Sequence, residues 1–169
     1  MPSTPVRRLA LCAVLTAAAL ALSFGENLLP LAVLLPLPGL RLGLANLVTV
    51  YALCRLSVRE AALILCARCL LAALVGGNAA GLWFSLSGGV LALLTMAAAL
   101  RFKKFSLVGV CIFGAAAHNT GQIVASLLYF RSPAPLLYLP PLLACSVVTG
   151  TVTGFAALFL LKRIPENTA

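Results

Sequence analysis

Six long apolar runs, joined by short polar or basic connections, constrain the fold of this chain more than any other feature of its sequence. Hydrophobic residues make up 63% of the 169 residues and charged residues only 9%, which is far too apolar for a soluble domain. Each run holds roughly 15–25 mainly apolar residues, enough to cross a bilayer as a helix. We therefore expect an all-α integral membrane protein with a single transmembrane domain over residues 1–169. The expected spans are 8–24, 40–55, 59–76, 82–101, 106–130 and 139–162.

Basic residues divide unevenly between the two sides of this bundle once the N-terminus is placed in the cytoplasm. Arg131 falls outside, whereas nine basic residues fall inside. This bias follows the positive-inside rule. The sequence therefore predicts a six-transmembrane-helix bundle in the cell membrane with both termini cytoplasmic. The nine inside positions are Arg7, Arg8, Arg55, Arg59, Arg101, Lys103, Lys104, Lys162 and Arg163.

The net charge of +9 would by itself suggest a nucleic-acid partner. Because the basic residues stand between apolar runs, membrane topology explains them and we expect no nucleic-acid partner. The first run follows Arg7 and Arg8 and resembles a signal peptide, but five further runs favour an uncleaved first span. Cys66 and Cys69 have CxxC spacing; without a second pair this is a weak metal or redox signal, so we expect no cofactor and no metal.

Arg68 lies in the middle of an apolar run, AALILCARCLLAALVGG. A charged side chain at the centre of a membrane helix costs about 2.5–3.5 kcal/mol on insertion scales. Such residues usually face the inside of a bundle and mark a ligand or ion path. At about 1.5 Å per residue, Arg68 lies roughly 13 Å from the cytoplasmic end of its span, near the midplane. The sequence therefore predicts a polar site inside the bundle.

Other polar residues are expected beside Arg68, in the outer half of the bundle. His118, Asn119 and Gln122 share one helical face because they stand three or four residues apart. Two arginines against one glutamate leave such a pocket net positive, which favours a small anionic or strongly hydrogen-bonding solute. The candidate substrate-binding residues are Arg68, His118, Asn119, Gln122, Arg41, Asn46 and Glu26.

A purely structural interpretation of these polar residues stays open. Polar side chains also join transmembrane helices by hydrogen bonds. Arg68 could pair with Glu26 or with backbone carbonyls, and Arg41 is near enough to the surface to extend its charge into the headgroup region.

Two further segments suggest how such a pocket would be covered and how its helices would pack or dock. The outer connection 25–39 contains three prolines and is largely apolar, so we expect a semi-rigid cap over the bundle. Ala13, Ala17 and Ala21 recur every four residues on the first span. Such small-residue stripes let helices approach closely, either within the chain or against a partner.

The chain contains few residues that could carry out catalysis. It has no aspartate, three glutamates and one histidine. A prenyl diphosphate synthase needs aspartate-rich clusters to hold the diphosphate through magnesium. The G-x-x-x-x-G-K-[ST] loop that binds ATP phosphates is also missing from the sequence. We therefore expect that this chain by itself is not an enzyme.

Three stretches resemble a known family: residues 38–46 (PGLRLGLAN), 85–89 (SLSGG) and 114–122 (GAAAHNTGQ). They are similar to the signature stretches of the Gx transporter family, which is also labelled heptaprenyl diphosphate synthase component I. That family resembles the substrate-binding S components of energy-coupling factor (ECF) transporters. The resemblance implies six helices and an outward-facing pocket capped by the loop between the first two helices. It also implies an alanine face on the first helix, matched here by Ala13, Ala17 and Ala21.

Two functions follow from this resemblance as expectations. The first is an S-component-like subunit that binds a small solute and docks on an ECF coupling transmembrane subunit, with ATPases supplied separately. The alternative is an accessory membrane subunit in menaquinone and isoprenoid metabolism, with a prenyltransferase partner. A membrane anchor for electron transfer to the cell exterior, with a redox subunit as partner, belongs to the same alternative.

Overall fold

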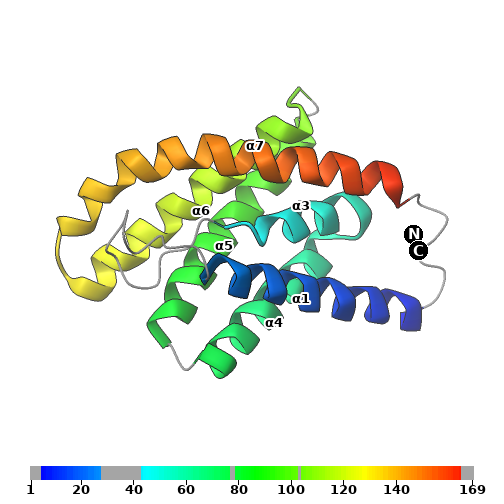
Figure 1. The fold of residues 1–169 in the computed structure, drawn as a ribbon, viewed down its shortest axis with the longest axis horizontal. Coiled ribbons are helices and arrows are strands. Elements are labelled where there is room, and N and C mark those ends of the chain that lie inside the picture. The colour runs from blue at the N-terminus through cyan, green and yellow to red at the C-terminus, as the bar shows by residue number, and fades with distance from the viewer. Residues whose placement is uncertain (1–4, 28–42, 77–78, 103, 165–169) are drawn as a thin grey trace.

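The computed structural model describes residues 5–27, 43–76, 79–102 and 104–164, and these ranges are helical apart from short connections (Figure 1). Six α-helices and one 3₁₀ turn lie within the described ranges. The α-helices are α1 (Pro5–Asn27), α3 (Asn46–Arg55), α4 (Val58–Gly76), α5 (Ala79–Arg101), α6 (Leu107–Phe130) and α7 (Leu139–Arg163), and the 3₁₀ turn is η1 (Ala134–Tyr138).

Four helices, α1, α5, α6 and α7, are long and apolar enough to cross a membrane. Five of the six expected spans match a helix whose ends lie within three residues of the expected ones. The second differs, because α3 begins at Asn46 rather than at residue 40, and residues 40–42 lie outside the described ranges. With 10 residues, α3 is about 15 Å long, roughly half the thickness of a bilayer core. The 19 residues of α4 include three charged ones, Arg59, Glu60 and Arg68.

Local hydrogen bonds explain where two of the helices begin. At the start of α4, the Ser57 amide donates to Glu60 Oε2 at 2.8 Å and the Glu60 amide donates to Ser57 Oγ at 3.3 Å. This reciprocal pair satisfies two amides that the helix itself cannot satisfy. At the start of α6, the Gly109 amide donates to Ser106 Oγ at 3.1 Å. These caps fix the first turns of α4 and α6.

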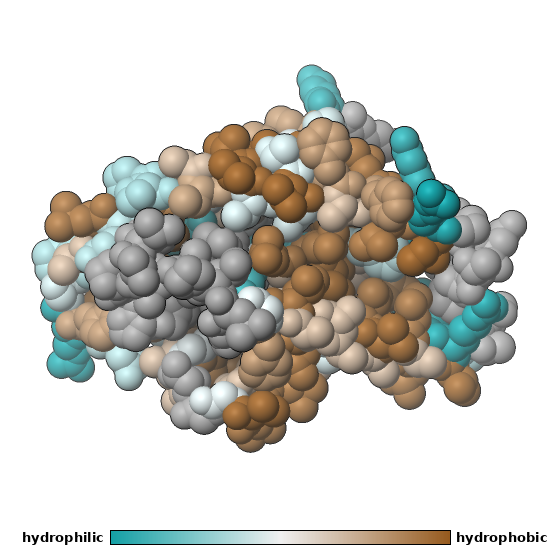
Figure 2. All heavy atoms as spheres, viewed as in Figure 1, coloured by the Kyte–Doolittle hydropathy of each residue, from teal (hydrophilic) through white to brown (hydrophobic). Residues whose placement is uncertain are grey.

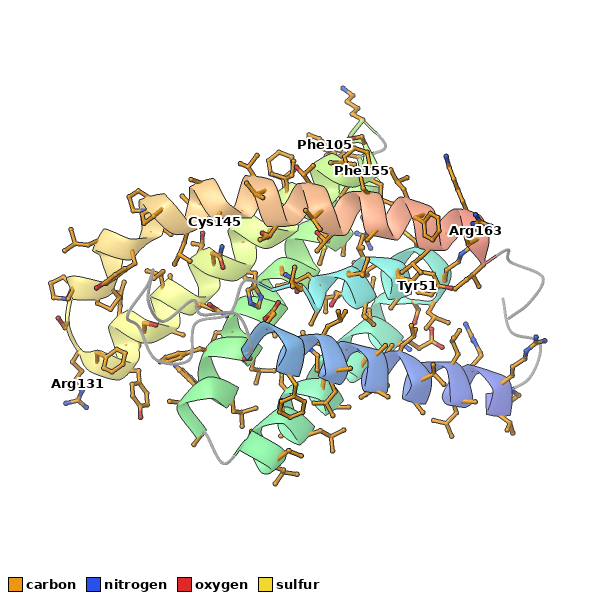
Figure 3. The ribbon with its side chains drawn as sticks, in the orientation of Figure 1. Tyr51, Phe105, Arg131, Cys145, Phe155 and Arg163 are labelled. Atoms are coloured by element: carbon orange, nitrogen blue, oxygen red, sulfur yellow. The ribbon has the colours of Figure 1, made fainter. Side chains whose placement is uncertain are left out.

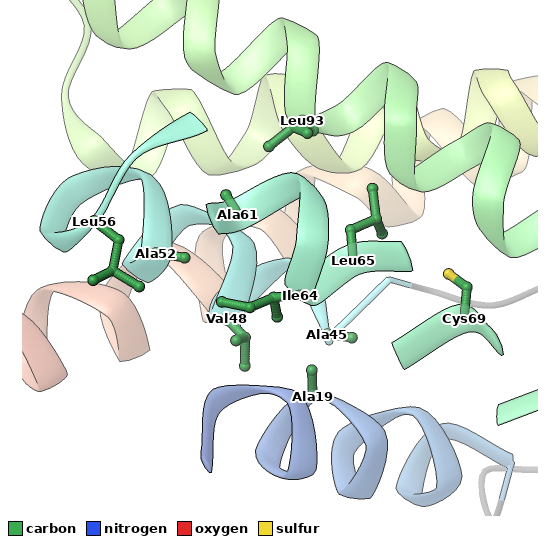
Figure 4. Packing of buried hydrophobic residues seen from close by; sticks show 10 residues of the cluster. All are labelled: Ala19, Ala45, Val48, Ala52, Leu56, Ala61, Ile64, Leu65, Cys69 and Leu93. Atoms are coloured by element: carbon green, nitrogen blue, oxygen red, sulfur yellow. The ribbon is translucent and has the colours of Figure 1, made fainter. Parts of the chain in front are cut away.

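The core forms around the short helix α3. One cluster joins α3 to α1, α4 and α5 and includes Ala19, Val48, Ile64 and Leu93 (Figure 4). A second cluster joins the other side of α3 to α5, α6 and α7. Arg55, at the end of α3, donates to the Leu161 carbonyl at 2.7 Å and to the Ile164 carbonyl at 2.8 Å. The short helix is thereby held against both halves of the bundle.

Glycines bring α5, α6 and α7 into close contact. A Cβ added at Gly121 of α6 would lie 2.9 Å from Gly88 Cα of α5. One added at Gly150 of α7 would lie 2.5 Å from Ile112 Cα, and one at Gly154 would lie 2.7 Å from Val108 Cα. The G-x-x-x-G spacing in α7 therefore serves packing against α6 within the chain.

The outside of the bundle is unusually apolar. Large hydrophobic side chains such as Leu9, Leu74, Leu137 and Phe155 are exposed, and apolar residues dominate the centre of the face seen in Figure 2. Water-soluble proteins rarely expose such continuous apolar surface. Together with the four long apolar helices, this surface indicates a membrane protein.

Candidate functional site

Arg68 projects from the middle of α4 into the bundle, as its position in an apolar run predicts. It is 2% exposed, and its Nη1 donates to Ser23 Oγ of α1 at 2.9 Å. The Ser23 hydroxyl in turn donates to the Ala19 carbonyl at 2.9 Å. Arg68 Nη2 is buried and has no hydrogen-bond partner among the described residues. The side chain therefore keeps donor capacity inside the bundle.

Glu26 lies in the last turn of α1, three residues beyond Ser23, and is also buried. Its Oε1 accepts a hydrogen bond from the backbone amide of Leu44, just before α3. In the described part of the chain, the Arg68 side chain is bonded to Ser23 and forms no ion pair with Glu26. Glu26 therefore ties the C-terminal end of α1 to the residues just before α3.

His118 and Gln122 lie together on α6, as their spacing predicts. Gln122 Nε2 is 2.9 Å from His118 Nε2, and both side chains are buried. With the amide nitrogen as donor, His118 Nε2 accepts and the proton of a neutral imidazole sits on Nδ1. The pair lies against α5, because a Cβ added at Gly88 would be 2.9 Å from Gln122 Cγ and 3.1 Å from His118 Cε1.

Gly43 brings the start of α3 onto the same histidine. Its φ of +80° lies in the left-handed region, which glycine adopts without strain. A Cβ added there would lie 2.9 Å from His118 Cδ2 and 2.8 Å from Asn46 Nδ2. Asn46 is 5% exposed, and neither its Oδ1 nor its Nδ2 has a hydrogen-bond partner in the described ranges. This amide is a second buried group with unused hydrogen-bonding capacity.

Asn119 faces another neighbour. Its Nδ2 donates to the Leu142 carbonyl at 3.0 Å and to Ser146 Oγ at 2.8 Å, both on α7. Asn119 thus joins α6 to α7, whereas His118 and Gln122 face α5 and the Gly43 turn. For Asn119, the structure shows hydrogen bonds between two helices.

Two further hydroxyl groups belong with these buried polar side chains. The sequence alone did not mark either of them as a site residue. Ser23 precedes Glu26 by three residues on α1, so the helical spacing could have found it. Ser85 of α5 precedes Gly88 by three residues and is 2% exposed. Its Oγ has no hydrogen-bond partner among the residues described. We call Ser23, Glu26, Asn46, Arg68, Ser85, His118 and Gln122 the polar cluster.

Other expected features lie on the surface or outside the described ranges. Arg41, and the cap 25–39 beyond residue 27, lie outside the described residues. Ala13, Ala17 and Ala21 are exposed on α1, while Ala19 and Ser23 face the bundle. The alanine stripe is therefore not used for packing within the described part of the chain.

The polar cluster offers hydrogen-bonding groups that could hold a ligand. Among the residues described, its buried atoms without a hydrogen-bond partner include donors on Arg68 and Asn46 and oxygens on Asn46 and Ser85. Such groups can hold an anionic or strongly hydrogen-bonding solute. Within the described ranges, no three histidine, cysteine or acidic side chains gather where they could hold a metal ion.

The comparison with protein families gives one match. The model described as "Heptaprenyl diphosphate synthase component I" matches residues 15–160. The chain belongs to the heptaprenyl diphosphate synthase component I family. Comparisons with curated proteins and with solved structures gave no match. The region shared with this family runs from the middle of α1 almost to the end of α7, and it includes the whole polar cluster.

Proposed function

We propose that this chain is the membrane-embedded accessory subunit of a prenyl-chain-forming complex, in which a separate prenyltransferase supplies catalysis. The observation that carries the proposal is the family match over residues 15–160. A component I implies a second component, and the name of the family identifies its product as a prenyl diphosphate. The chain has no aspartate. Magnesium clusters for the diphosphate would therefore come from the partner.

We further propose six crossings with both termini in the cytoplasm. Arg163 and Arg131 lie at opposite ends of the molecule (Figure 3). At the Arg163 end, Arg55 binds the last carbonyls of α7, and Arg8 of α1 lies 3.4 Å from Glu60 of α4. A cytoplasmic location for this basic end follows the positive-inside rule. The second crossing would contain α3.

Reconstitution tests the accessory role. The chain is placed in nanodiscs of phosphatidylethanolamine and phosphatidylglycerol, and the prenyltransferase component of the same host is added with farnesyl and isopentenyl diphosphates. We expect a stable complex and a several-fold increase in long-chain product over the prenyltransferase with empty nanodiscs. Equal product with and without this chain, and no complex, would rule the proposal out.

A second candidate is an S-component-like subunit that binds a small solute for an ECF transporter. The observation that favours it is the polar cluster, where Arg68 Nη2 and the Asn46 amide are buried without partners in the described part. The exposed alanine stripe would then dock on the coupling subunit.

A solute-uptake assay distinguishes the transporter subunit from the accessory subunit. Cells that express the chain together with an ECF module should accumulate a labelled solute, and both Arg68→Ala and Ala17→Trp should abolish the accumulation. If no solute from the growth medium is accumulated above the level of cells lacking the chain, the second candidate fails.

A further inference from the structure

A long apolar groove lies between α1 and α7, above the short helix α3. Its volume is about 470 Å³, within the roughly 300–1,000 Å³ that small-molecule pockets occupy. Helix α1 packs on α3 and α4, whereas α7 packs on α3 and α6. The two long helices therefore lie apart on either side of α3, which forms the floor between them (Figure 1). Apolar residues fill this part of the face in Figure 2.

The lining of the groove is amphipathic along its length. Its apolar walls include Leu11, Leu15, Leu22, Val48, Tyr51 and Leu160. Among the described residues that line it, the charged one is Arg7, in the first turns of α1. Arg7 lines this groove together with Ile164, which directly follows the last turn of α7 with Lys162 and Arg163. The groove thus has a hydrocarbon-like body and one basic end.

We infer that this groove binds the isoprenoid chain of a prenyl diphosphate, with the diphosphate at the Arg7 end. The inference rests on the proposed accessory role, from which it takes the class of substrate. In a bilayer the isoprenoid chain already lies among apolar lipid tails, so the groove would hold it by close packing against its apolar walls rather than by removal from water. A guanidinium group matches phosphate oxygens with two parallel hydrogen bonds. In the proposed topology the basic end faces the cytoplasm, where the partner enzyme forms the product.

The width of the groove depends on small residues of α1. Ala10 and Ala18 line it two turns apart, so a bulky side chain at either position would fill the space. Ala144 of α7 is equally small and exposed but does not line the groove. Ala18→Trp and Ala144→Trp are therefore matched substitutions, one inside the groove and one outside it.

Photolabelling in nanodiscs of phosphatidylethanolamine and phosphatidylglycerol tests the inference. The probe is farnesyl diphosphate carrying a diazirine on its last isoprene unit, and the labelled peptides are identified by mass spectrometry. We expect labelling of α1 and α3, about tenfold weaker in Ala18→Trp and unchanged in Ala144→Trp. Arg7→Gln should weaken competition by unlabelled farnesyl diphosphate but not competition by farnesol, which lacks the diphosphate.

Two outcomes would overturn the inference. One is labelling that Ala18→Trp leaves unchanged, and the other is competition by added phosphatidylglycerol as effective as that by farnesyl diphosphate, which would make the groove an ordinary lipid site. Complex formation with the prenyltransferase is measured on the same variants. If the complex forms and increases product but the groove is not labelled, only the inference about the groove is wrong. If the unmodified chain forms no complex, the proposed accessory role is wrong.

Discussion

At the scale of single residues, Arg68 is a charged side chain that the fold buries at a cost in desolvation. It is 2% exposed, and one hydroxyl, that of Ser23, satisfies one of its two terminal nitrogens. A buried charge with so few partners adds little stability, since its desolvation exceeds the gain from its contacts. A ligand that bonds to the remaining nitrogen would offset that cost. Substitution of Arg68 should therefore affect ligand binding and the stability of the ligand-free protein differently.

Substitution of Arg68 and Ser23 should shift stability in opposite directions. In the ligand-free protein, Arg68→Met removes a poorly partnered charge, so we expect an unchanged or higher Tm. Ser23→Ala leaves the guanidinium without that partner and should cost about 1–3 kcal/mol. Thr16→Ala is the control, because Thr16 makes the same bond to its own helix, with the Cys12 carbonyl. Tm is measured in detergent from the fluorescence of Trp83, the single tryptophan. A lower Tm for Arg68→Met would show that the charge is structural.

Gly88 tests the close approach of α5 to the histidine. In Gly88→Ala the new Cβ would lie 2.7 Å from the His118 carbonyl oxygen, which is backbone and cannot easily move. We expect a loss of about 1–3 kcal/mol from this overpacking. Gly25→Ala is the matched control, since no atom of the described residues lies within 4 Å of its added Cβ. Alanine favours helix over glycine by up to about 1 kcal/mol, so this control should be neutral or stabilising. Equal Tm values for the two variants would contradict the packing described.

At the scale of elements, the contact between α6 and α7 depends on glycines and one amide. Gly150 and Gly154 bring the backbones together. Asn119 then reaches both the Leu142 carbonyl and the Ser146 hydroxyl. Hydrogen bonds between membrane helices measure about 0.6 kcal/mol on average, because the unfolded helices also find partners. This amide should therefore contribute modestly to the contact.

A double-mutant cycle on Asn119 and Ser146 measures that contribution. We expect Asn119→Ala and Ser146→Ala to be less destabilising together than the sum of the two, with a coupling of about 0.6–1.7 kcal/mol. Unfolding in mixed micelles supplies the free energies of unfolding. The cycle of Asn119 with Thr149, which donates to its own helix at Cys145, is the control and should show no coupling. A coupling near zero for the first pair would contradict the bond.

The helices could be predicted well from the sequence, and the contacts between them less well. Apolar runs located α1, α4, α5, α6 and α7 because burial in a membrane requires continuous hydrophobic stretches. The start of α3 was missed, since it depends on the positive φ of Gly43 and on the tertiary bond from Leu44 to Glu26.

The candidate site, too, could be predicted from the sequence only in part. Helical spacing alone placed His118 beside Gln122, because four residues make about one turn. It could not place Asn119 against α7, since periodicity does not say which helix lies opposite a given face. Burial of Arg68 followed from its apolar surroundings, whereas its bond to Ser23 depends on the packing of α1 on α4.

At the scale of the whole molecule, charge sets the proposed orientation. The ends of α3, α5 and α7 each carry a basic residue, whereas the turn after α6 holds Arg131 at the opposite end in Figure 3. The proposed prenyltransferase contact and the basic end of the groove both require the end with Arg55 and Arg163 to face the cytoplasm. Both of these proposals therefore depend on the same orientation in the membrane.

Single cysteines introduced into a cysteine-free background test that orientation. In intact cells, a membrane-impermeant maleimide should label Ser132→Cys, which stands in the turn between α6 and η1. Lys104→Cys, between α5 and α6, should react only after the membrane is permeabilised. Both positions are exposed or partly exposed in the structure, so access to the reagent depends on the side of the membrane. The reverse pattern would invert the topology.

Native mass spectrometry of the protein, extracted gently from its own host membranes, tests the accessory role most directly. We predict a complex whose mass includes a prenyltransferase subunit and which forms equally well with Arg68→Ala, since Arg68 is buried inside the bundle and is not on the surface that a partner would contact. A small polar solute retained by the unmodified protein and lost from Arg68→Ala, with no prenyltransferase bound, would contradict that role and support solute transport instead.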